Sequence, residues 1–528
     1  GLHRSISPCA CHRRSNHVHR RFNFMLEAAR EANIHKNGRT LRSLRNADNW
    51  KSFALPSGDG YFNLQTEDIG DVPVRLFLTP SLLSEAEDTL YRQIVNATRF
   101  PSVKLVVITP DVHYGYGVPV GCVILTGANN GAVAMGPVGY DIGCGMMSAR
   151  SEVSADQATP QKKLEFNRAV MARVSMGAGG KSHRLGRLSE AEFNNLVRGG
   201  AEYYTEKYGA SFDRSRAERH RIPVADDWTI PKGGKGRPER GMDQLGSLGG
   251  GNHFIELQRS EMTGTLFVQV HTGSRGFGHG LATNYFEMAR QERPDAVTDI
   301  DLGYFTPESR HNKDYLNAVA AGGNYAILNR LIIFEAVAAA FREVFSSDLD
   351  LIYEISHNLV QRESHPDFGD VWVHRKGATR AFPAGHPFLK NTVWADEGHP
   401  VLIPGSNMDY SYILRPLPGA VKSGFSVNHG AGRKLSRSQA SRTLSQRQID
   451  DEYAAAGILV NIDGRVPLDE AAPAYKSSEE VLRAVTEAGL VEVEHTLWPL
   501  ASLKGVDERR RAKRERVKGK TRKSNRHY

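Results

Sequence analysis

Gly139-Tyr140-Asp141-Ile142-Gly143-Cys144-Gly145-Met146 is the stretch around which the rest of this chain is organised. It carries a carboxylate and a thiol three positions apart, in a backbone that is rich in glycine. Because glycine allows positive φ angles and close approach of the backbone to a ligand, Asp141 and Cys144 are candidate metal ligands, a hard oxygen and a soft sulfur. The alternative is a tight turn in which the aspartate bonds its own backbone and the cysteine is a small buried hydrophobe.

Four histidines share one context, a short loop at or beside an apolar strand: His253, His271, His357 and His429. Each of them alone is more simply explained as a hydrogen-bonded structural histidine. Together with the aspartate and the cysteine, they form a set that suits Mn, Zn, Fe or Co better than Mg or Ca, which prefer oxygen ligands. One thiolate can bridge two ions, and paired metals serve phosphoryl and nucleotidyl transfer.

His429 differs from the other three histidines because small residues follow it, in His429-Gly430-Ala431-Gly432-Arg433. Such a segment leaves backbone N–H groups free to hold an anion, and Arg433 is able to clamp a phosphate. A histidine nitrogen beside phosphate oxygens and metals is a candidate covalent nucleophile. A simple turn before a helix is the alternative for this segment.

The composition is that of an ordinary soluble globular protein, with 40% hydrophobic and 24% charged residues among 528. No run approaches the roughly 20 apolar residues of a membrane span. The N-terminal segment has no apolar stretch typical of a secretion signal. The four cysteines are too few for a disulfide framework. We therefore expect a cytoplasmic protein without a membrane partner.

The formal net charge of +9 is concentrated in two tails. Residues 1–25 hold five arginines and no acid, and residues 506–528 hold eleven basic against three acidic residues. The body of the chain is therefore mildly acidic, at −4. Basic tails of this kind bind polyanions without specificity, which is consistent with nucleic acid but locates no site.

Apolar runs and helical spacing outline the expected elements. Strands are predicted at 103–108, 122–125, 265–270, 352–355, 371–374 and 401–403. Helices are predicted at 155–178, at 314–344 with an interruption at Gly322-Gly323, and up to about residue 455. Residues 213–241, rich in Arg, Lys, Gly and Pro, are expected to form a long surface excursion.

Two serine–glutamate pairs have the spacing that caps the start of a helix. Ser84 is followed by Glu87, and Ser477 by Glu480. Both pairs predict that a helix begins just after the serine.

Eight segments resemble the RtcB family of RNA-splicing ligases, in the family's order and roughly its spacing. They are residues 110–121, 139–146, 246–257, 271–279, 356–358, 375–385, 404–406 and 429–433. The resemblance implies an enzyme of tRNA splicing or RNA repair that depends on GTP and two Mn²⁺ ions. Such an enzyme joins an RNA 2′,3′-cyclic phosphate or 3′-phosphate to a 5′-hydroxyl.

The resemblance also implies the domain organisation. Residues 60–505 are expected to form one large catalytic domain of mixed α/β (α+β) class. Residues 1–59 would be an N-terminal extension, and residues 506–528 a basic tail.

Carried over residue by residue, the resemblance implies the site. Asp141, Cys144 and His253 would bind one Mn²⁺, and Cys144, His271 and His357 the other. His429 would be the catalytic histidine that becomes guanylylated. The implied nucleotide contacts are Asn252, His253, Glu256, His357, Asn358, Pro404, Gly405, Ser406, Asn407, Ser411, His429, Gly430, Ala431, Gly432, Arg433 and Lys504.

The chain departs from the family pattern after Pro404-Gly405-Ser406. The family usually continues Met-Gly-Thr, whereas this chain has Asn407-Met408-Asp409. The added acid in a nucleotide-facing loop leaves open a related enzyme that acts on other phosphate ends. A non-catalytic RNA-binding protein is a further alternative, but binding alone would not require the Asp/Cys/His set.

Overall fold

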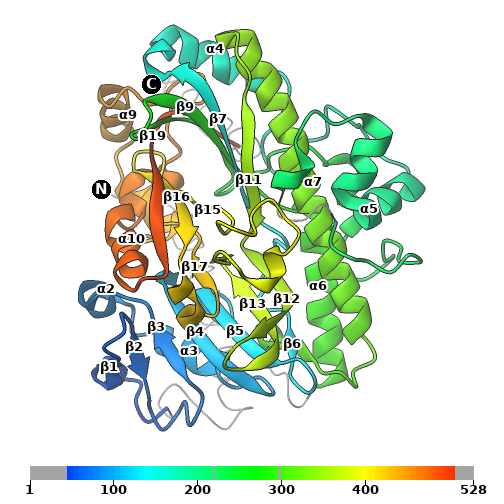
Figure 1. Cartoon of the computed structure of the whole chain (residues 1–528), viewed down its shortest axis with the longest axis vertical. Helices are drawn as coiled ribbons and strands as arrows, with labels where there is room; N and C mark the ends of the chain where they lie inside the picture. The colour runs from blue at the N-terminus through cyan, green and yellow to red at the C-terminus, as the bar shows by residue number, and fades with distance from the viewer. Residues whose placement is uncertain (1–43, 218–220, 295–298, 506–528) are drawn as a thin grey trace, which may run out of the picture.

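The computed structural model describes residues 44–217, 221–294 and 299–505. The predicted basic tail, and residues 1–43 of the predicted N-terminal extension, lie outside the described residues. The fold is mixed α/β, as predicted, and forms one large body (Figure 1).

Two large β-sheets form the centre of this body. The first sheet has the strand order β1 (Ala54–Pro56), β2 (Phe62–Leu64), β3 (Val74–Leu76), β4 (Val103–His113), β5 (Val120–Gly127), β13 (Gly369–Lys376) and β12 (Asn358–His365). The second has the order β11 (Asp350–Ser356), β7 (Gly145–Ser154), β9 (Thr265–Thr272), β8 (Phe254–Ser260), β19 (Val491–Lys504), β16 (Ser411–Pro416) and β15 (Val401–Ile403). The six strands predicted from the sequence are confirmed, most of them longer than expected.

Two small sheets and a set of helices complete the described fold. The small sheets pair β6 (Val133–Ala134) with β10 (Tyr304–Phe305), and β14 (Ala378–Arg380) with β17 (Ser426–Asn428); β18 (Leu459–Val460) pairs with β19. The helices are α2 (Pro80–Glu85), α3 (Leu90–Ala97), α4 (Pro160–Met171), α5 (Glu190–Tyr208), α6 (Arg275–Glu292), α7 (Asn312–Phe345), α8 (Arg437–Thr443), α9 (Gln446–Ala455) and α10 (Ser478–Glu487).

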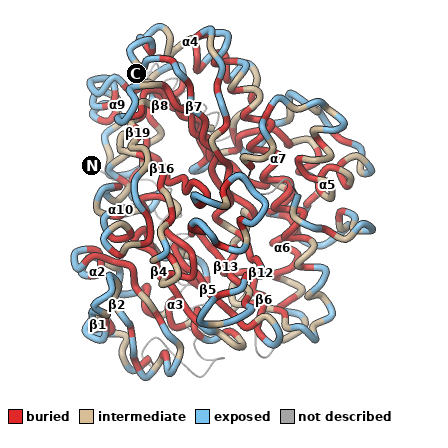
Figure 2. The backbone as a smooth tube through the Cα atoms, in the orientation of Figure 1, coloured by how far each residue is buried: buried red, intermediate tan, exposed pale blue. Residues whose placement is uncertain are grey.

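The sheets pack face to face because their strands alternate apolar side chains between two sides. In β4, Leu105 and Val107 join the core between the sheets, whereas Val106 and Ile108 pack with α2 and α3. On the far side of the second sheet, Leu257 and the helices α4 to α7 form the largest core. The result is four layers, helix–sheet–sheet–helix. Figure 2 shows that the central strands are mostly buried.

Helix α7 is the central helix of the largest core, and it packs on α4, α5, α6 and the second sheet. By length and composition it could cross a membrane, but 78% of its most apolar window is buried within the fold. The predicted interruption at Gly322-Gly323 is wrong, because the helix is continuous. A Cβ at Gly322 would lie 3.0 Å from Ile142 Cγ2. The missing side chain therefore lets α7 contact the 139–146 loop directly.

Neither of the two predicted serine–glutamate pairs caps a helix in the structure. Ser84 lies inside α2, and the residue before α10, Ser477, makes no side-chain capping bond among the described residues. Glu480 instead accepts a hydrogen bond from Thr79 Oγ1 at 2.6 Å. The helix after Ser477 is present, so the helix was predicted correctly and its cap was not.

The described part of the 213–241 segment contains the 3-10 helix η4 (Arg214–Arg216) and the start of η5 (Pro238–Asp243), is otherwise irregular, and is only partly exposed. Val224 and Ile230 are buried in the largest core. Asn324 of α7 and Asn194 of α5 accept hydrogen bonds from backbone N–H groups of the segment. At the other end of the chain, β1 pairs with β2, so the first sheet begins before residue 60.

Candidate active site

A cavity of about 490 Å³ lies where strand ends of both sheets meet. It gathers most of the site residues predicted from the sequence: Asp141, Cys144, Asn252, Glu256, His271, His357, Asn358, Pro404, Gly405, Ser406, Asn407, His429, Gly430, Ala431, Gly432, Arg433 and Lys504. Among the described residues of the predicted set, His253 and Ser411 lie outside this lining. Both still contact residues of the lining: His253 Nε2 lies 3.6 Å from Cys144 Sγ, and Ser411 Oγ accepts a hydrogen bond from the Gly405 N–H at 2.9 Å.

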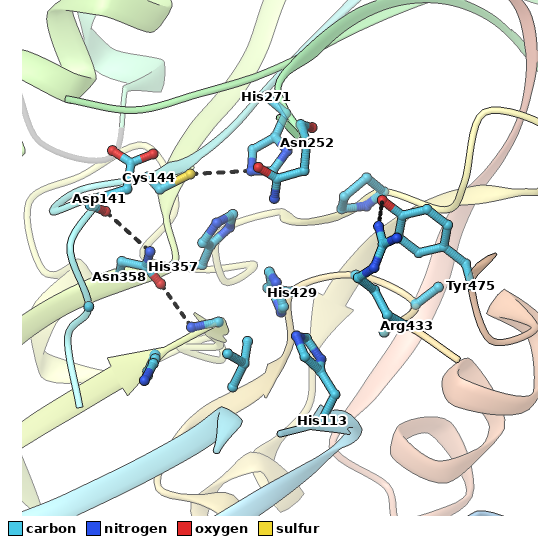
Figure 3. Close-up of a pocket in the computed structure, with 18 of the residues that line it drawn as sticks. His113, Asp141, Cys144, Asn252, His271, His357, Asn358, His429, Arg433 and Tyr475 are labelled. Carbon is cyan, nitrogen blue, oxygen red and sulfur yellow. Dashed lines mark hydrogen bonds between the residues drawn. The ribbon is translucent and has the colours of Figure 1, made fainter. Parts of the chain in front are cut away.

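Three of the predicted metal ligands, Cys144, His253 and His271, form one buried cluster. Asp141, Cys144, His271 and His357 lie close together in Figure 3. Cys144 Sγ lies 3.3 Å from His271 Nε2 and 3.6 Å from His253 Nε2. The Nε2 of His253 also lies 3.0 Å from Asp141 Oδ2. The ring of His357 is next to that of His271, with centroids 5.2 Å apart. The sulfur and the two nitrogens, all within 4.8 Å of one another, are a plausible metal-binding set.

The other nitrogens of two rings fix their orientation. His253 Nδ1 lies 2.9 Å from the Leu248 carbonyl oxygen, and His271 Nδ1 lies 3.0 Å from the Asn252 carbonyl oxygen. With a metal ion bound, a proton on each Nδ1 would leave the lone pair of Nε2 for the ion, which is the usual arrangement of metal-binding histidines. Burial lowers the pKa of His271 and of His357, so both rings are neutral and able to act as ligands.

The backbone around Asp141 is shaped to hold its carboxylate. Ser274 donates its N–H to Asp141 Oδ1 at 3.0 Å. A Cβ at Gly273 would lie 2.2 Å from the same oxygen, so only glycine fits beside it. Burial opposes ionisation, but the hydrogen bond from His253 and that from Ser274 outweigh it and lower the pKa of Asp141. Asn358 donates to the Asp141 carbonyl at 3.2 Å, which ties the loop to β12 (Figure 3).

Arg330 of α7 connects the loops that carry three of the ligands. Its guanidinium donates to the carbonyls of Gly143 and Thr272 at 2.7 and 3.1 Å, next to Cys144 and His271. It also donates to Ser356 Oγ at 2.8 Å, next to His357. A buried ion pair with Glu354 at 2.8 Å balances its charge. The sequence did not reveal this arginine, because it lies within an otherwise apolar helical stretch.

His429 lies between the metal cluster and a group of basic residues (Figure 3). Its ring packs edge-on against His357, with centroids 4.8 Å apart. Its Nδ1 lies 2.7 Å from Oδ2 of Asp111, which is fully buried. The same oxygen accepts the backbone N–H groups of His429 and Gly430, each at 3.1 Å. Burial opposes ionisation of Asp111, but the contacts with His429 outweigh it and lower its pKa.

Asp111 was missed as a site residue in the sequence, although it belongs to the 110–121 segment. It is the partner that orients the histidine, with Thr109 Oγ1 donating to its other oxygen at 2.6 Å. A carboxylate on Nδ1 leaves Nε2 as the nitrogen with a free lone pair.

The basic residues beyond His429 surround a buried carboxylate, Glu470. Lys504 Nζ lies 3.3 Å from it, and Arg433 and Arg437 are also paired with it. Arg433 further donates to the carbonyl oxygens of Leu435 and Asp469. Arg433, which was expected to bind a phosphate, is therefore already hydrogen-bonded to and paired with acceptors of the protein itself. Arg437, which lines the cavity, was not singled out from the sequence.

The variant loop after Ser406 does not bring its acid to the cavity. Asp409 accepts the backbone N–H of Ser478 at 3.0 Å, at the start of α10. Asn407 does line the cavity, and its Oδ1 accepts a hydrogen bond from the Tyr453 hydroxyl. The added acid therefore does not face the cavity, whereas the change to Asn407 does.

Glu256 lines the cavity close to Lys504 and is almost completely buried. Burial raises its pKa to about 7, although Gln258 and Lys504 favour the ionised form. A buried carboxyl group at a cavity wall suits recognition of N–H donors on a ligand.

Comparisons with known proteins agree with this geometry. A family model described as tRNA-splicing ligase RtcB matches residues 93–505. The tRNA-splicing ligase RtcB of Pyrobaculum aerophilum is 35% identical over 466 residues, which cover 82% of this chain and 95% of that protein. The protein of the same name from Thermococcus kodakarensis is 35% identical over 464 residues, 82% and 95% of the two chains. The RNA-splicing ligase RtcB of Mycobacterium tuberculosis is 37% identical over 439 residues, 78% of this chain and 100% of that protein. The chain therefore belongs to the tRNA-splicing ligase RtcB family.

Proposed function

We propose that the protein is an RNA ligase that joins RNA ends with a 2′,3′-cyclic phosphate or 3′-phosphate to ends with a 5′-hydroxyl, using GTP. Membership of the RtcB family supports ligase activity on RNA. The observation that carries the chemistry is the place of His429, between a candidate metal cluster and a set of basic residues. A role in tRNA splicing or in RNA repair is consistent with this activity.

The cluster fits Mn²⁺ by its donors. Sulfur, imidazole nitrogen and carboxylate oxygen together suit a borderline transition metal better than Mg²⁺ or Ca²⁺. We assign Asp141, Cys144 and His253 to one ion, and Cys144, His271 and His357 to the second. Bound there, the ions would neutralise charge that develops on phosphate oxygens.

His429 supplies the nucleophile in the proposed first transfer. With its Nδ1 proton held by Asp111, Nε2 attacks the α-phosphorus of GTP. A P–N bond forms, the bond to the β-phosphate oxygen breaks, and pyrophosphate leaves. The RNA 3′-phosphate, formed by water opening any cyclic end, then takes the GMP group. The 5′-hydroxyl finally attacks the RNA phosphate, and GMP leaves.

The basic residues and Glu256 suit the two ends of the nucleotide. Arg433, Arg437 and Lys504 carry the positive charge that phosphates need, once the ligand displaces their contacts with Glu470. The Glu256 carboxyl group is placed to accept the N–H donors of a guanine base.

Incubation with α-labelled GTP and MnCl₂ tests the proposal. The wild-type protein should form an acid-labile GMP adduct that peptide mapping locates on His429. His429→Ala should lose the adduct and GTP-dependent ligation, yet still ligate a prepared RNA 3′-pp-5′-G end. His183→Ala is the matched control, because His183 is an exposed histidine outside the lining of the cavity. An adduct formed at a normal rate by His429→Ala would show that the nucleophile is another residue.

A further inference from the structure

One side of the cavity has aromatic and acidic walls, which the proposed steps leave without a role. We call it the aromatic arm and define it by Tyr116, Tyr140, Phe286 and Asp301, all of which line the cavity. Tyr140 stacks on Phe286, with ring centroids 4.7 Å apart. Tyr116 and Asp301 are close enough to act electrostatically on the Tyr140 hydroxyl. These four side chains therefore form one wall rather than scattered contacts.

The loop that carries Tyr116 is held rigidly by its neighbours. Gln93 exchanges two hydrogen bonds with the backbone of Gly115, at 2.7 and 2.9 Å. Asn96 donates to the Gly117 carbonyl at 2.8 Å, and Lys376 Nζ donates to the Tyr116 carbonyl at 3.0 Å. The Tyr116 side chain is nevertheless 69% exposed. An aromatic ring that is exposed on a fixed backbone loses little entropy when a flat ligand stacks on it.

The charges divide the cavity into two unlike sides. The basic residues Arg433, Arg437 and Lys504 gather around Glu470. The aromatic arm instead contains the Asp301 carboxyl group, with Asp299 near it. The Lys376 ammonium, which donates to the carbonyls of Tyr116 and Val118, offsets only one of these two carboxylates. A terminal phosphate is therefore favoured on the basic side and disfavoured in the aromatic arm.

We propose that the aromatic arm binds the terminal nucleoside of the RNA strand that carries the 5′-hydroxyl. Its base stacks on the exposed ring of Tyr116, because Phe286 and His279 already pack on the ring of Tyr140. A hydroxyl or N–H group of the nucleoside donates to Asp301. Aromatic stacking of this kind accepts any base, so the arm recognises an unpaired end rather than a sequence. This assignment rests on the proposed ligase function, because it supplies the second end of that reaction.

Steady-state ligation with each strand varied in turn tests the assignment. The probes are an oligoribonucleotide with a 5′-hydroxyl end and a partner with a 3′-phosphate end, with GTP and MnCl₂ saturating. Tyr116→Ala should raise the KM for the 5′-hydroxyl strand about tenfold, the scale of one lost base stack. Tyr116→Phe keeps the ring and should restore the KM. Tyr114→Ala is the matched control, because Tyr114 is 48% exposed on the same loop but outside the lining.

A second measurement tests the role of charge. A 5′-phosphorylated competitor should inhibit the wild-type protein less than its 5′-hydroxyl counterpart, and Asp301→Asn should narrow that difference. Equal inhibition by both competitors in the wild type would overturn the assigned role of Asp301.

Two outcomes would overturn the arm itself. One is an unchanged KM for the 5′-hydroxyl strand in Tyr116→Ala, and the other is a rise only in the KM for the 3′-phosphate strand. If the wild-type protein forms neither adduct nor product, the proposed function fails. In that case fluorescence anisotropy still tests the aromatic arm, by comparing the affinity of the 5′-hydroxyl strand for the wild type and for Tyr116→Ala. Equal affinities would overturn the arm.

Discussion

Replacement of Arg330 should separate the stability of the core from the assembly of the metal site. Arg330→Met removes the cation that compensates the buried Glu354 carboxylate, both side chains being 0% exposed. Breaking a buried pair by removing one partner costs roughly 3–5 kcal/mol. Arg330→Met with Glu354→Leu removes both charges and should recover the part of that loss that comes from the uncompensated carboxylate. The acceptors of Gly143, Thr272 and Ser356 lose their donor in both variants, so recovery should be incomplete. Urea unfolding of the three proteins measures the free energies.

Metal binding should not recover in the double variant. The hydrogen bonds of Arg330 to Gly143, Thr272 and Ser356 are lost in both variants, so the ligand loops lose their common donor. Loss of such supporting bonds typically lowers metal affinity about 10- to 100-fold. Titration calorimetry with MnCl₂ and metal analysis of the purified proteins measure the effect. Wild-type affinity in a double variant of partly restored stability would refute the positioning role.

Three further predictions concern the thiolate, a buried carboxyl group and the basic tail. Cys144→Ala should empty or cripple both metal sites while Asp141→Ala mainly affects one; full metal retention by Cys144→Ala, in metal analysis, would refute the bridge. Because burial raises the pKa of Glu256 to about 7 from 4.5, the folded state keeps a proton that the unfolded state loses. The free energy of unfolding of the wild type, relative to Glu256→Gln, should therefore fall by about 2–3 kcal/mol as pH rises from 5 to 8. Urea midpoints of the two proteins that shift equally across that range would contradict this prediction. Deleting residues 506–528 should weaken RNA binding and flatten its salt dependence but spare the GMP adduct; identical binding isotherms at several salt concentrations would exclude the tail as a contact.

The candidate metal ligands could be predicted from the sequence because each stands in a short loop of Gly, Ser or Asn residues beside an apolar strand. That local pattern is visible without the fold, and the structure brings Cys144, His253 and His271 together as expected. The order of the strands could not be predicted in the same way. β19 pairs with β8 across more than two hundred residues, and no local signal specifies such a pairing.

The supporting residues were missed for the same physical reason. Asp111 contacts the backbone of His429 across 318 positions, and Arg330 contacts Gly143 across 187. Neither contact has a sequence period. The glycines at 322–323 were misinterpreted because glycine lowers helix propensity, whereas here close packing against Ile142 overrides that preference.

The central place of β19 has a consequence for the order in which the protein can assemble during synthesis. This strand, the last of the described chain, lies between β8 and β16. Until residues 491–504 have left the ribosome, β8 and β16 each present an open strand edge that can pair with other chains. Lys504 also reaches the cavity only then. Nascent or truncated chains that end before β19 should therefore aggregate rather than show partial activity. The lining of the cavity is completed only after almost all of the described fold has been made.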